Sequence, residues 1–273
     1  MSTAFVLGGG GVLGAAEVGM LRALFEAGVT PDLVVGTSVG ALNGALVAAH
    51  PEPGVVDRLM ELWESAAAGR EVYGDRAVRQ VTRAVRTGTH LYSGGPLRKR
   101  LKDELGDLTF EELPVRFECC AASIERAAEH WFTEGRVVDA VMASAAVPGL
   151  LAPATVGGEH YLDGGIVNSV PVGRAVAGGA DRIFVLQVGR IERPLKAPRR
   201  PWEVARVSFE IARRHRFHRE MAEIPEGVVA HVLPTGGGSA RDDSLLAYRS
   251  FDAVGARVDK AYRASQAYLL EHL

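Results

Sequence analysis

Residues 33–40 read LVVGTSVG, an apolar run that ends in a Gly-x-Ser-x-Gly sequence. The run has the character of a short buried strand, and the residues after it are rich in Ala, Leu and Gly, as in a closely packed helix. A serine in a turn between a strand and a helix, flanked by glycines, is the setting of a nucleophile elbow. We therefore interpret Gly36, Ser38 and Gly40 as such a turn and Ser38 as a candidate nucleophile. The alternative is a serine that only caps the helix.

A second glycine-rich turn lies upstream of this one. Residues 3–7 (TAFVL) predict a buried strand, and Gly9, Gly11 and Gly14 form a Gly-x-Gly-x-x-Gly sequence directly after it. Backbone N–H groups in such a turn, at the start of a helix, favour an anion. A dinucleotide site would need an acidic residue at the end of the next strand, where this chain has a Thr-Ser pair. We therefore favour another anion, or an oxyanion, as the group that this turn binds.

The first fifty residues alternate strand, turn, helix, strand, turn and helix. This alternation predicts an α/β fold around a central, mostly parallel sheet flanked by helices. Residues 51–107 carry prolines and charged helical patterns, and we interpret them as a helical insertion. The patterns predict further strands over 115–124, 129–133, 160–163, 182–188 and 229–233, and helices over 136–147, 171–179 and about 248–271.

The composition excludes several classes of protein. The chain has 273 residues with 31 Lys and Arg against 33 Asp and Glu, so it lacks the basic excess of a nucleic-acid-binding protein. Its two cysteines, Cys119 and Cys120, are adjacent and form no zinc-binding pattern, so we expect no metal and a reducing compartment. The long uncharged stretches are broken by glycines and prolines, which makes them poor membrane spans. We expect a cytoplasmic protein, with a peripheral membrane contact left open.

A candidate base for the serine comes much later in the chain. Asp163, Gly164 and Gly165 stand at the end of the short predicted strand 160–163. A carboxylate between an apolar strand and two glycines can be partly desolvated and closely approached, which suits a general base for Ser38. The alternative is an ordinary turn or helix-capping aspartate.

The order of elements speaks against an ordinary α/β-hydrolase. In that fold the serine follows several strands and a histidine comes late in the chain, whereas Ser38 follows only the second predicted strand. The late histidines are His231, inside a predicted strand, and His272, the penultimate residue. We interpret both as surface or edge residues, so neither is the predicted base.

Together, the three motifs resemble the patatin-like phospholipase family, in particular its bacterial-type acyl hydrolases. That family pattern has a Gly-rich loop, Gly-x-Ser-x-Gly and Asp-Gly-Gly or Asp-Gly-Ala in this order, and the linking stretches 143–148 (ASAAVP) and 168–172 (NSVPV) also match it. The resemblance spans residues 4 to about 190. It implies a three-layer catalytic domain over 4–190, with the strand and helices of 191–273 packed on the same domain.

The resemblance also implies a chemistry and its residues. Ser38 would attack an ester carbonyl, Asp163 would act as base in a two-residue dyad, and the N–H groups of Gly10 and Gly11 would form the oxyanion hole. Such a carboxylic ester hydrolase needs no metal and no cofactor, and its substrate would be a lipid or a small ester. Many members carry Arg or Lys where this chain has Leu13, which favours neutral esters at least as much as phospholipids.

Two other functions stay open at this point. An acyl-carrier transferase also uses a Gly-x-Ser-x-Gly serine but pairs it with a histidine. A catalytically silent lipid-binding regulatory protein could keep the same fold.

The segment 190–220 is basic, with ten Lys and Arg against four Asp and Glu. Three aromatic residues, Trp202, Phe209 and Phe217, are interleaved with these charges. One interpretation is a solvated helix with a single core face. The other is an interfacial surface that meets anionic lipid, and this makes a peripheral membrane contact through 190–220 a prediction.

Overall fold

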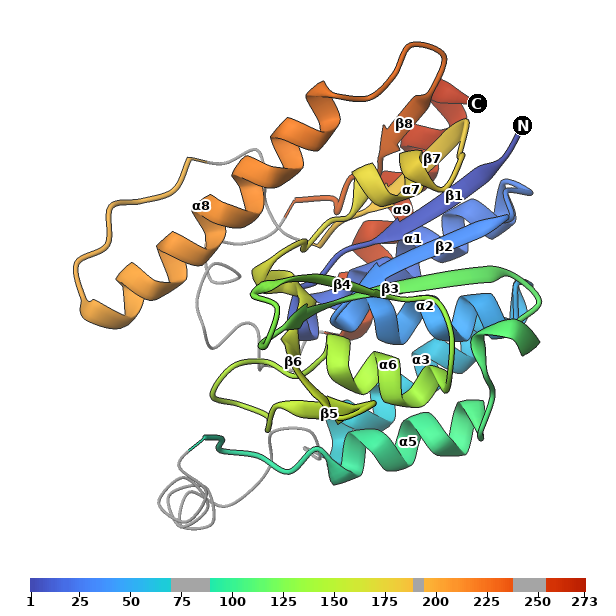
Figure 1. Ribbon diagram of the computed structural model, residues 1–273. Coiled ribbons are helices and arrows are strands. Elements are labelled where there is room, and N and C mark those ends of the chain that lie inside the picture. The colour runs from blue at the N-terminus through green and yellow to red at the C-terminus, as the bar shows by residue number, and fades with distance from the viewer. Residues whose placement is uncertain (70–88, 189–193, 238–253) are drawn as a thin grey trace.

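A computed structural model describes residues 1–69, 89–188, 194–237 and 254–273 of the chain (Figure 1). Its strands are β1 (Thr3–Leu7), β2 (Leu33–Thr37), β3 (Arg116–Ser123), β4 (Ala128–Phe132), β5 (Ala154–Val156), β6 (Glu159–Asp163), β7 (Arg182–Leu186) and β8 (Val229–Val232). Within the described residues these eight strands form one sheet in the order β5-β6-β3-β2-β1-β7-β8, with β4 paired to β3. The predicted α/β class with a central sheet is confirmed.

The centre of the sheet is parallel and one side of it is antiparallel. Strands β3, β2, β1, β7 and β8 pair in parallel, whereas β4 and β6 pair antiparallel with β3, and β5 antiparallel with β6. In the register, Leu7 at the end of β1 lies beside Gly36 near the end of β2. The glycine-rich turn after β1 and the serine turn after β2 therefore leave the sheet side by side.

Helices cover both faces of this sheet (Figure 1). One face carries most of them, and the other carries α7 and α8. Their bounds are α1 (Ala15–Glu26), α2 (Val39–Ala49), α3 (Gly54–Gly69), α5 (Gly95–Leu105), α6 (Val137–Ser144), α7 (Val172–Ala177), α8 (Pro201–Ala222) and α9 (Val254–His272), with short 3-10 turns η1 (Gly11–Gly14), η2 (Phe110–Glu112) and η3 (Gly164–Ile166).

The two faces enclose two separate hydrophobic cores. Along β1, Phe5 and Leu7 point into the larger core, while Ala4 and Val6 point into the smaller one below α7 and α8. Successive side chains of a strand point to opposite faces, so a strand buried on both sides reads as the continuous apolar run seen in this sequence. The result is the three-layer arrangement that the resemblance implies.

The C-terminal part returns to the same sheet. Strand β8 pairs with β7 at the sheet edge, and α9 packs closely on α1. A Cβ added at Gly19 of α1 would lie 2.1 Å from the carbonyl oxygen of Val258 in α9, so only glycine allows this approach. The division into 4–190 and 191–273 stays a prediction.

Element boundaries differ from the predicted ones at several places. Strand β5 was not predicted, because three half-exposed residues give no recognisable period. The helix predicted over 171–179 is only the six residues of α7. The predicted insertion contains α3 and α5, while its residues 70–88 and the first residues of the helix predicted from 248 lie outside the described part of the chain.

The described residues contain neither a membrane-spanning helix nor a cluster of metal ligands. None of the helices there combines the length and the apolar character needed to cross a bilayer. In the same residues, no group of three or more His, Cys, Asp or Glu side chains is placed to hold a metal ion. The adjacent thiols of Cys119 and Cys120 are buried and unpaired with each other in β3.

Candidate active site

Ser38 stands in a strained turn between β2 and α2. Its backbone has φ 55° and ψ −120°, a conformation that residues other than glycine rarely adopt. A Cβ at Gly40 would lie 2.2 Å from the carbonyl oxygen of Leu7, and one at Gly36 would lie 2.6 Å from that of Gly40. Both motif glycines are therefore required by close backbone approach.

A buried hydroxyl holds this turn in place. The N–H of Ser38 donates to Oγ of Ser144 at 2.9 Å, and that hydroxyl donates to the carbonyl oxygen of Cys120 at 2.6 Å. Ser144 ends α6 and lies in the stretch 143–148 that matches the family, but no role was predicted for it from the sequence. Its contact offsets part of the strain, which for such a conformation is on the order of 1–3 kcal/mol.

The structure brings Ser38 and Asp163 into direct contact. Oγ of Ser38 donates to Oδ2 of Asp163 at 2.5 Å, and the N–H of Gly165 donates to Oδ1 at 2.7 Å. Both side chains are buried, at 7% and 6% exposure. Burial raises the pKa of Asp163 to about 6, and the two hydrogen bonds offset part of that rise. A carboxylate with a pKa in this range can accept a proton near neutral pH.

The Asp-Gly-Gly sequence needs its first glycine for packing. A Cβ at Gly164 would lie 2.1 Å from the carbonyl oxygen of Cys120 in β3. The turn that follows Asp163 is therefore pressed directly against the strand beside it.

The glycine-rich loop lies against the serine turn. The N–H of Gly9 donates to the carbonyl oxygen of Ser169 at 2.8 Å, and a Cβ at Gly9 would lie 3.4 Å from Cβ of Ser38. Gly11 has φ 57°, in the left-handed region that favours glycine. Within the described part of the chain, no acceptor pairs with the N–H groups of Gly10 and Gly11. They are candidate donors for a developing oxyanion.

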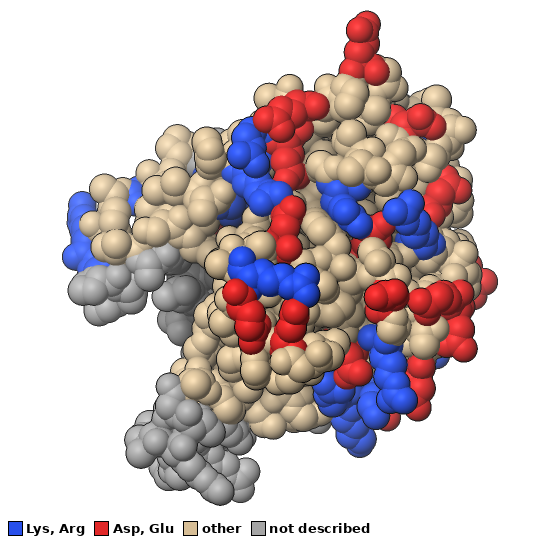
Figure 2. All heavy atoms as spheres, in the orientation of Figure 1, with Lys and Arg blue, Asp and Glu red and all other residues tan. Residues whose placement is uncertain are grey.

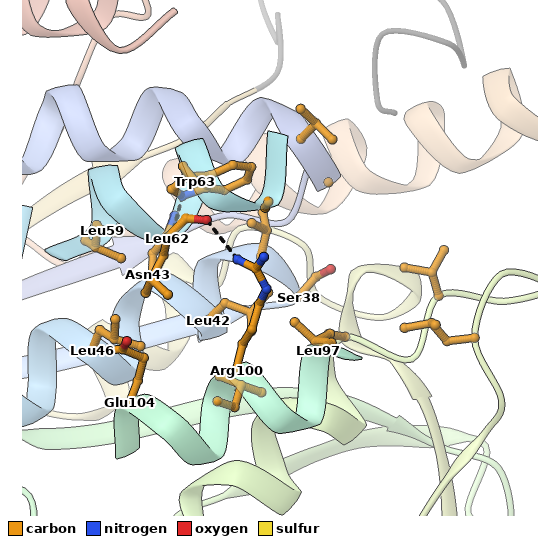
Figure 3. A pocket seen from close by; sticks show the side chains of 18 residues that line it. Ser38, Leu42, Asn43, Leu46, Leu59, Leu62, Trp63, Leu97, Arg100 and Glu104 are labelled. Atoms are coloured by element: carbon orange, nitrogen blue, oxygen red, sulfur yellow. Dashed lines mark hydrogen bonds between the residues drawn. The ribbon is translucent and has the colours of Figure 1, made fainter. Parts of the chain in front are cut away.

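A largely apolar cavity opens beside Ser38 (Figure 3). About 140 Å³ of it is accessible to the centre of a water molecule. In the view of Figure 3, Leu46 and Glu104 lie at the left, and Ser38 lies to their right with further lining side chains beyond it. The lining residues come from the turns after β1 and β2, from α2, α3 and α5 and from the segment after α6, and they include Gly11, Val39, Leu42, Leu46, Leu59, Leu62, Trp63, Leu97, Leu101, Ala145, Val147 and Leu151.

Polar groups are few in this cavity. Arg100 donates to the carbonyl oxygen of Leu62 at 3.2 Å and to Oγ of Ser65 at 3.1 Å, which ties α5 to α3. Asn43 and Glu104 are two other polar residues in the lining. The cavity therefore suits an extended apolar group whose reacting end lies at Ser38.

Behind the cavity, Asn43 links its wall to the glycine-rich loop. Its Nδ2 donates to Oε2 of Glu17 at 2.7 Å and to the carbonyl oxygen of Gly14 at 3.1 Å, and its Oδ1 accepts from Nε1 of Trp63 at 3.2 Å. Glu17 is completely buried, and burial raises its pKa. Nothing in the local sequence marks these contacts, because their partners lie on three different helices.

Neither Leu13, which was singled out from the sequence, nor Asp32, which lies just before β2, joins the site. Leu13 is buried in the larger core and is not among the residues that line the cavity. Asp32 accepts a hydrogen bond from the N–H of Thr3 at 2.8 Å, so it ties the strands β1 and β2 together. Both positions are structural in this fold.

The late histidines lie away from Ser38. His231 is on the edge strand β8, as expected of an edge residue, but it is buried against Phe184 and Tyr268 rather than at the surface. His272 is exposed and stacks on Tyr268. No histidine is among the described residues that line the cavity.

Comparisons with known proteins identify the family of this chain. The family model described as patatin-like phospholipase matches residues 5–176. Lysophospholipase nte1 of Aspergillus terreus is 33% identical over 193 residues, and neuropathy target esterase sws of Drosophila melanogaster is 31% identical over 190 residues. These matches cover 70% and 69% of this chain but only 12% and 13% of those much longer proteins.

A solved structure shares the fold. The crystal structure of VipD from Legionella pneumophila matches with a TM-score of 0.52 at 14% sequence identity, over 99% of this chain and 67% of that one. The family model covers more than half of the chain and contains all three glycine motifs. The chain therefore belongs to the patatin-like phospholipase family.

Proposed function

We propose that this chain is a serine–aspartate acyl hydrolase that cleaves carboxylic esters of lipids through an acyl-enzyme. The observation that carries the proposal is the 2.5 Å hydrogen bond from Oγ of Ser38, which lines an apolar cavity, to the buried Asp163. A nucleophile in contact with a base, and beside unpaired backbone donors, is the arrangement that acyl transfer requires.

The reaction proceeds in two halves. Asp163 accepts the proton of Ser38 as Oγ attacks the ester carbonyl carbon, and the protonated Asp163 then donates to the departing alcohol. Asp163 next removes a proton from water, which attacks the acyl-enzyme and releases the acid, and Ser38 recovers its proton. The carboxylate therefore acts as base and then as acid in each half, and no other group is required.

The negative charge of each tetrahedral intermediate falls on the former carbonyl oxygen. The N–H groups of Gly10 and Gly11 are the proposed oxyanion hole. Because a single carboxylate is a weak base for a serine, these pre-aligned donors must supply much of the rate; loss of one such donor typically costs about 10²–10³ in turnover.

The proposed substrate is a lipid ester or a smaller ester with an apolar acyl chain. Leucines of α2, α3 and α5 line the cavity next to Ser38 and form an apolar surface for the acyl chain of the substrate. The relatives named lysophospholipase support a lipid substrate. Since the side chain of Leu13 is in the core, the turn itself offers no cationic side chain at that position for a phosphate, which fits neutral esters as well as phospholipids.

A fluorophosphonate probe and graded p-nitrophenyl esters test this proposal. We expect covalent labelling at Ser38 and turnover of short or medium-chain soluble esters, both abolished in Ser38→Ala, with thermal unfolding little changed because only one hydroxyl is lost. Phospholipid vesicles assayed in parallel distinguish head-group preference. Labelling without turnover would point to the acyl-carrier transferase, and a Ser38 that the probe does not label would point to the silent lipid-binding protein.

We also propose that the segment 190–220 makes a peripheral contact with anionic lipid. Its described part exposes Val204, Phe209 and Ile211 on α8 and carries exposed cations at Lys196 and Arg199. Helix α8 extends beyond the body of the protein at the end of the sheet where the parallel strands finish, and its outer end carries Lys or Arg side chains (Figures 1 and 2). Apolar side chains with neighbouring cations suit such a surface.

The contact is close to the proposed chemistry. A Cβ at Gly165, next to the catalytic candidate Asp163, would lie 3.4 Å from Cζ of Phe209. Sedimentation with anionic vesicles tests it: we expect binding that weakens as salt rises and in a Lys196→Glu, Arg199→Glu variant. Equal binding to anionic and neutral vesicles would contradict the electrostatic part.

A further inference from the structure

One short segment contacts all three motifs of the site. Residues 164–173 follow Asp163 directly. The carbonyl oxygen of Asn168 accepts from Oγ1 of Thr37 at 2.8 Å, next to Ser38. The carbonyl oxygen of Ser169 accepts from the N–H of Gly9 at 2.8 Å, at the start of the glycine-rich loop. The segment therefore sets the relative positions of the carboxylate, the serine turn and the loop.

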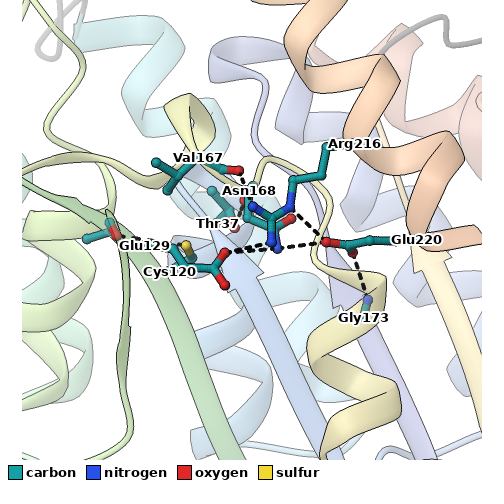
Figure 4. Close-up of polar contacts among 9 residues, drawn as sticks. Thr37, Cys120, Glu129, Val167, Asn168, Gly173, Arg216 and Glu220 are labelled. Carbon is teal, nitrogen blue, oxygen red and sulfur yellow. Dashed lines mark hydrogen bonds and ion pairs between the residues drawn. The ribbon is translucent and has the colours of Figure 1, made fainter. Parts of the chain in front are cut away.

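Two side chains of α8 hold this segment from the other side (Figure 4). Arg216 donates from Nη1 to the carbonyl oxygen of Val167 at 2.9 Å and from Nε to Oε1 of Glu220 at 2.8 Å. Glu220 accepts from the N–H of Gly173 at 2.7 Å through its other oxygen. Two points of the segment, Val167 and Gly173, are thus bound by one pair of residues on one helix.

The pair also reaches the middle of the segment and the neighbouring hairpin. Nδ2 of Asn168 donates to Oε1 of Glu220 at 3.1 Å. Nη2 of Arg216 donates to Oε2 of Glu129 in β4 at 2.8 Å. All three nitrogens of one guanidinium therefore donate at once, in the fixed planar directions that a guanidinium provides and a compact ammonium group does not.

Burial makes these contacts interdependent. The side chain of Glu220 is only 6% exposed, and its oxygens accept hydrogen bonds from Arg216 and from two donors of the segment. If Arg216 were lost, a buried carboxylate would remain next to Glu129, and the segment would have to move or admit water to compensate. A shift there would change the position of Asp163 and of Gly9 together.

We propose that Arg216 and Glu220 are positioning residues for the Ser38–Asp163 pair and for the glycine-rich loop. They touch no reacting atom and act through residues 164–173. The catalytic readout of this inference rests on the proposed hydrolase function, whereas the placement of the segment does not.

The competing role is simpler: the pair would only anchor α8 to the domain. An anchor affects the fraction of folded protein and leaves the turnover of each folded molecule unchanged. A positioning pair lowers kcat with little change in KM, because misplacement of the reacting groups by about 1 Å can cost about 10²-fold.

The chain offers a matched control pair. On α1, Arg22 donates from Nε to Oε1 of Glu26 at 2.9 Å, with the same spacing of four residues and the same atoms as Arg216 and Glu220. That pair is about half exposed and lies away from the segment.

The experiment compares Arg216→Met, Arg216→Lys and Glu220→Gln with Arg22→Met and Glu26→Gln. It measures kcat and KM on a soluble p-nitrophenyl ester, thermal unfolding, and amide hydrogen exchange of peptides covering 8–14 and 164–173. We expect Arg216→Met to lower kcat at least about tenfold at similar KM, with Arg216→Lys between it and the wild type. The control variants stay within about twofold of the wild type.

Amide hydrogen exchange tests the placement of residues 164–173 separately from the effect on catalysis. We expect faster exchange in both peptides of Arg216→Met, including the amide of Gly9, and no change in the controls. Faster exchange in Arg216→Met, found together with a wild-type protein that hydrolyses no ester, would support the placement role and refute the hydrolase function. Wild-type kcat and exchange in Arg216→Met would overturn the inference, as would a loss of activity fully explained by the loss of folded protein.

Discussion

Ser38 and Asp163 are 125 positions apart in the chain, yet Oγ of one lies 2.5 Å from Oδ2 of the other. Strand β3 sets this distance. Thr37 at the end of β2 pairs with Cys120, and Asp163 at the end of β6 pairs with the next residue, Ala121. Because β6 is antiparallel to β3, its last residue returns to the level at which β2 finishes. The serine and the carboxylate thus meet across one intervening strand.

The role of Asp163 as base predicts a large loss of turnover in Asp163→Asn. Asparagine keeps the shape of the side chain but cannot accept the serine proton, so we expect kcat to fall by about 10²–10⁴-fold. His231→Ala is the comparison, with kcat normalised to folded protein because His231 is buried. A His231→Ala variant as damaged as Asp163→Asn would favour a histidine-based transferase or triad.

The raised pKa of Asp163 predicts how activity depends on pH. The base must be ionised, and burial raises its pKa to about 6. We expect kcat/KM to be low in acid, to rise through pH 6 and to level off above it. Steady-state rates between pH 4.5 and 8.5 with one soluble ester give this profile. Full activity at pH 4.5 would mean that another group is the base.

The same pKa predicts a stability cost at neutral pH. The carboxyl has a pKa of about 6 in the folded protein against an ordinary value of 3.8, so the folded state holds its proton more tightly. The free energy of unfolding therefore falls as pH rises between these values and stays lower above them. Asparagine never ionises, so Asp163→Asn should be more stable than the wild type at pH 8, by on the order of 1–3 kcal/mol.

Thermal unfolding at pH 8 and at pH 4 measures this difference. The gain should shrink at pH 4, where the wild-type carboxyl is largely protonated in the folded protein. A variant that is less stable at pH 8 would show that the hydrogen bonds to Asp163 outweigh the burial of its charge.

The backbone of the glycine-rich loop predicts a specific effect of Gly11→Ala. Gly11 has φ 57°, where a Cβ costs about 1 kcal/mol or more, and relief of that strain would turn the N–H away from the oxyanion. We expect a lower kcat, of about tenfold or more, at similar KM, because oxyanion contacts matter most in the transition state.

Gly28→Ala is the matched control for this change. Gly28 has φ 73° after α1, and a Cβ there would meet no atom within 4 Å. Gly28→Ala introduces the same kind of backbone strain as Gly11→Ala but lies outside the site, so the kcat of the Gly28→Ala variant should equal that of the wild type. An effect of Gly11→Ala confined to KM would mean that the loop binds substrate instead of stabilising the oxyanion.

The sequence by itself determined the local chemistry and the class of fold. The strand–turn–helix pattern around Ser38, the glycines that backbone contacts demand at Gly36, Gly40 and Gly164, and the alternation of elements are short-range features. Each single strand, turn or helix can be read from consecutive residues, because backbone conformation and side-chain period are set by neighbours in the chain. The order of the three motifs was enough to indicate the family.

Only the tertiary structure decided which of these pieces meet. The antiparallel return of β6 beside β3, the cavity made from α2, α3 and α5, and the burial that raises the pKa of Asp163 depend on packing between segments far apart in the chain. Arg216 reads in the sequence as one more cation of a basic helix, and its contacts with Val167, Glu129 and Glu220 place it behind the site. Long-range contacts of this kind leave no period in the local sequence, because their geometry is fixed by the whole sheet and both of its helical layers.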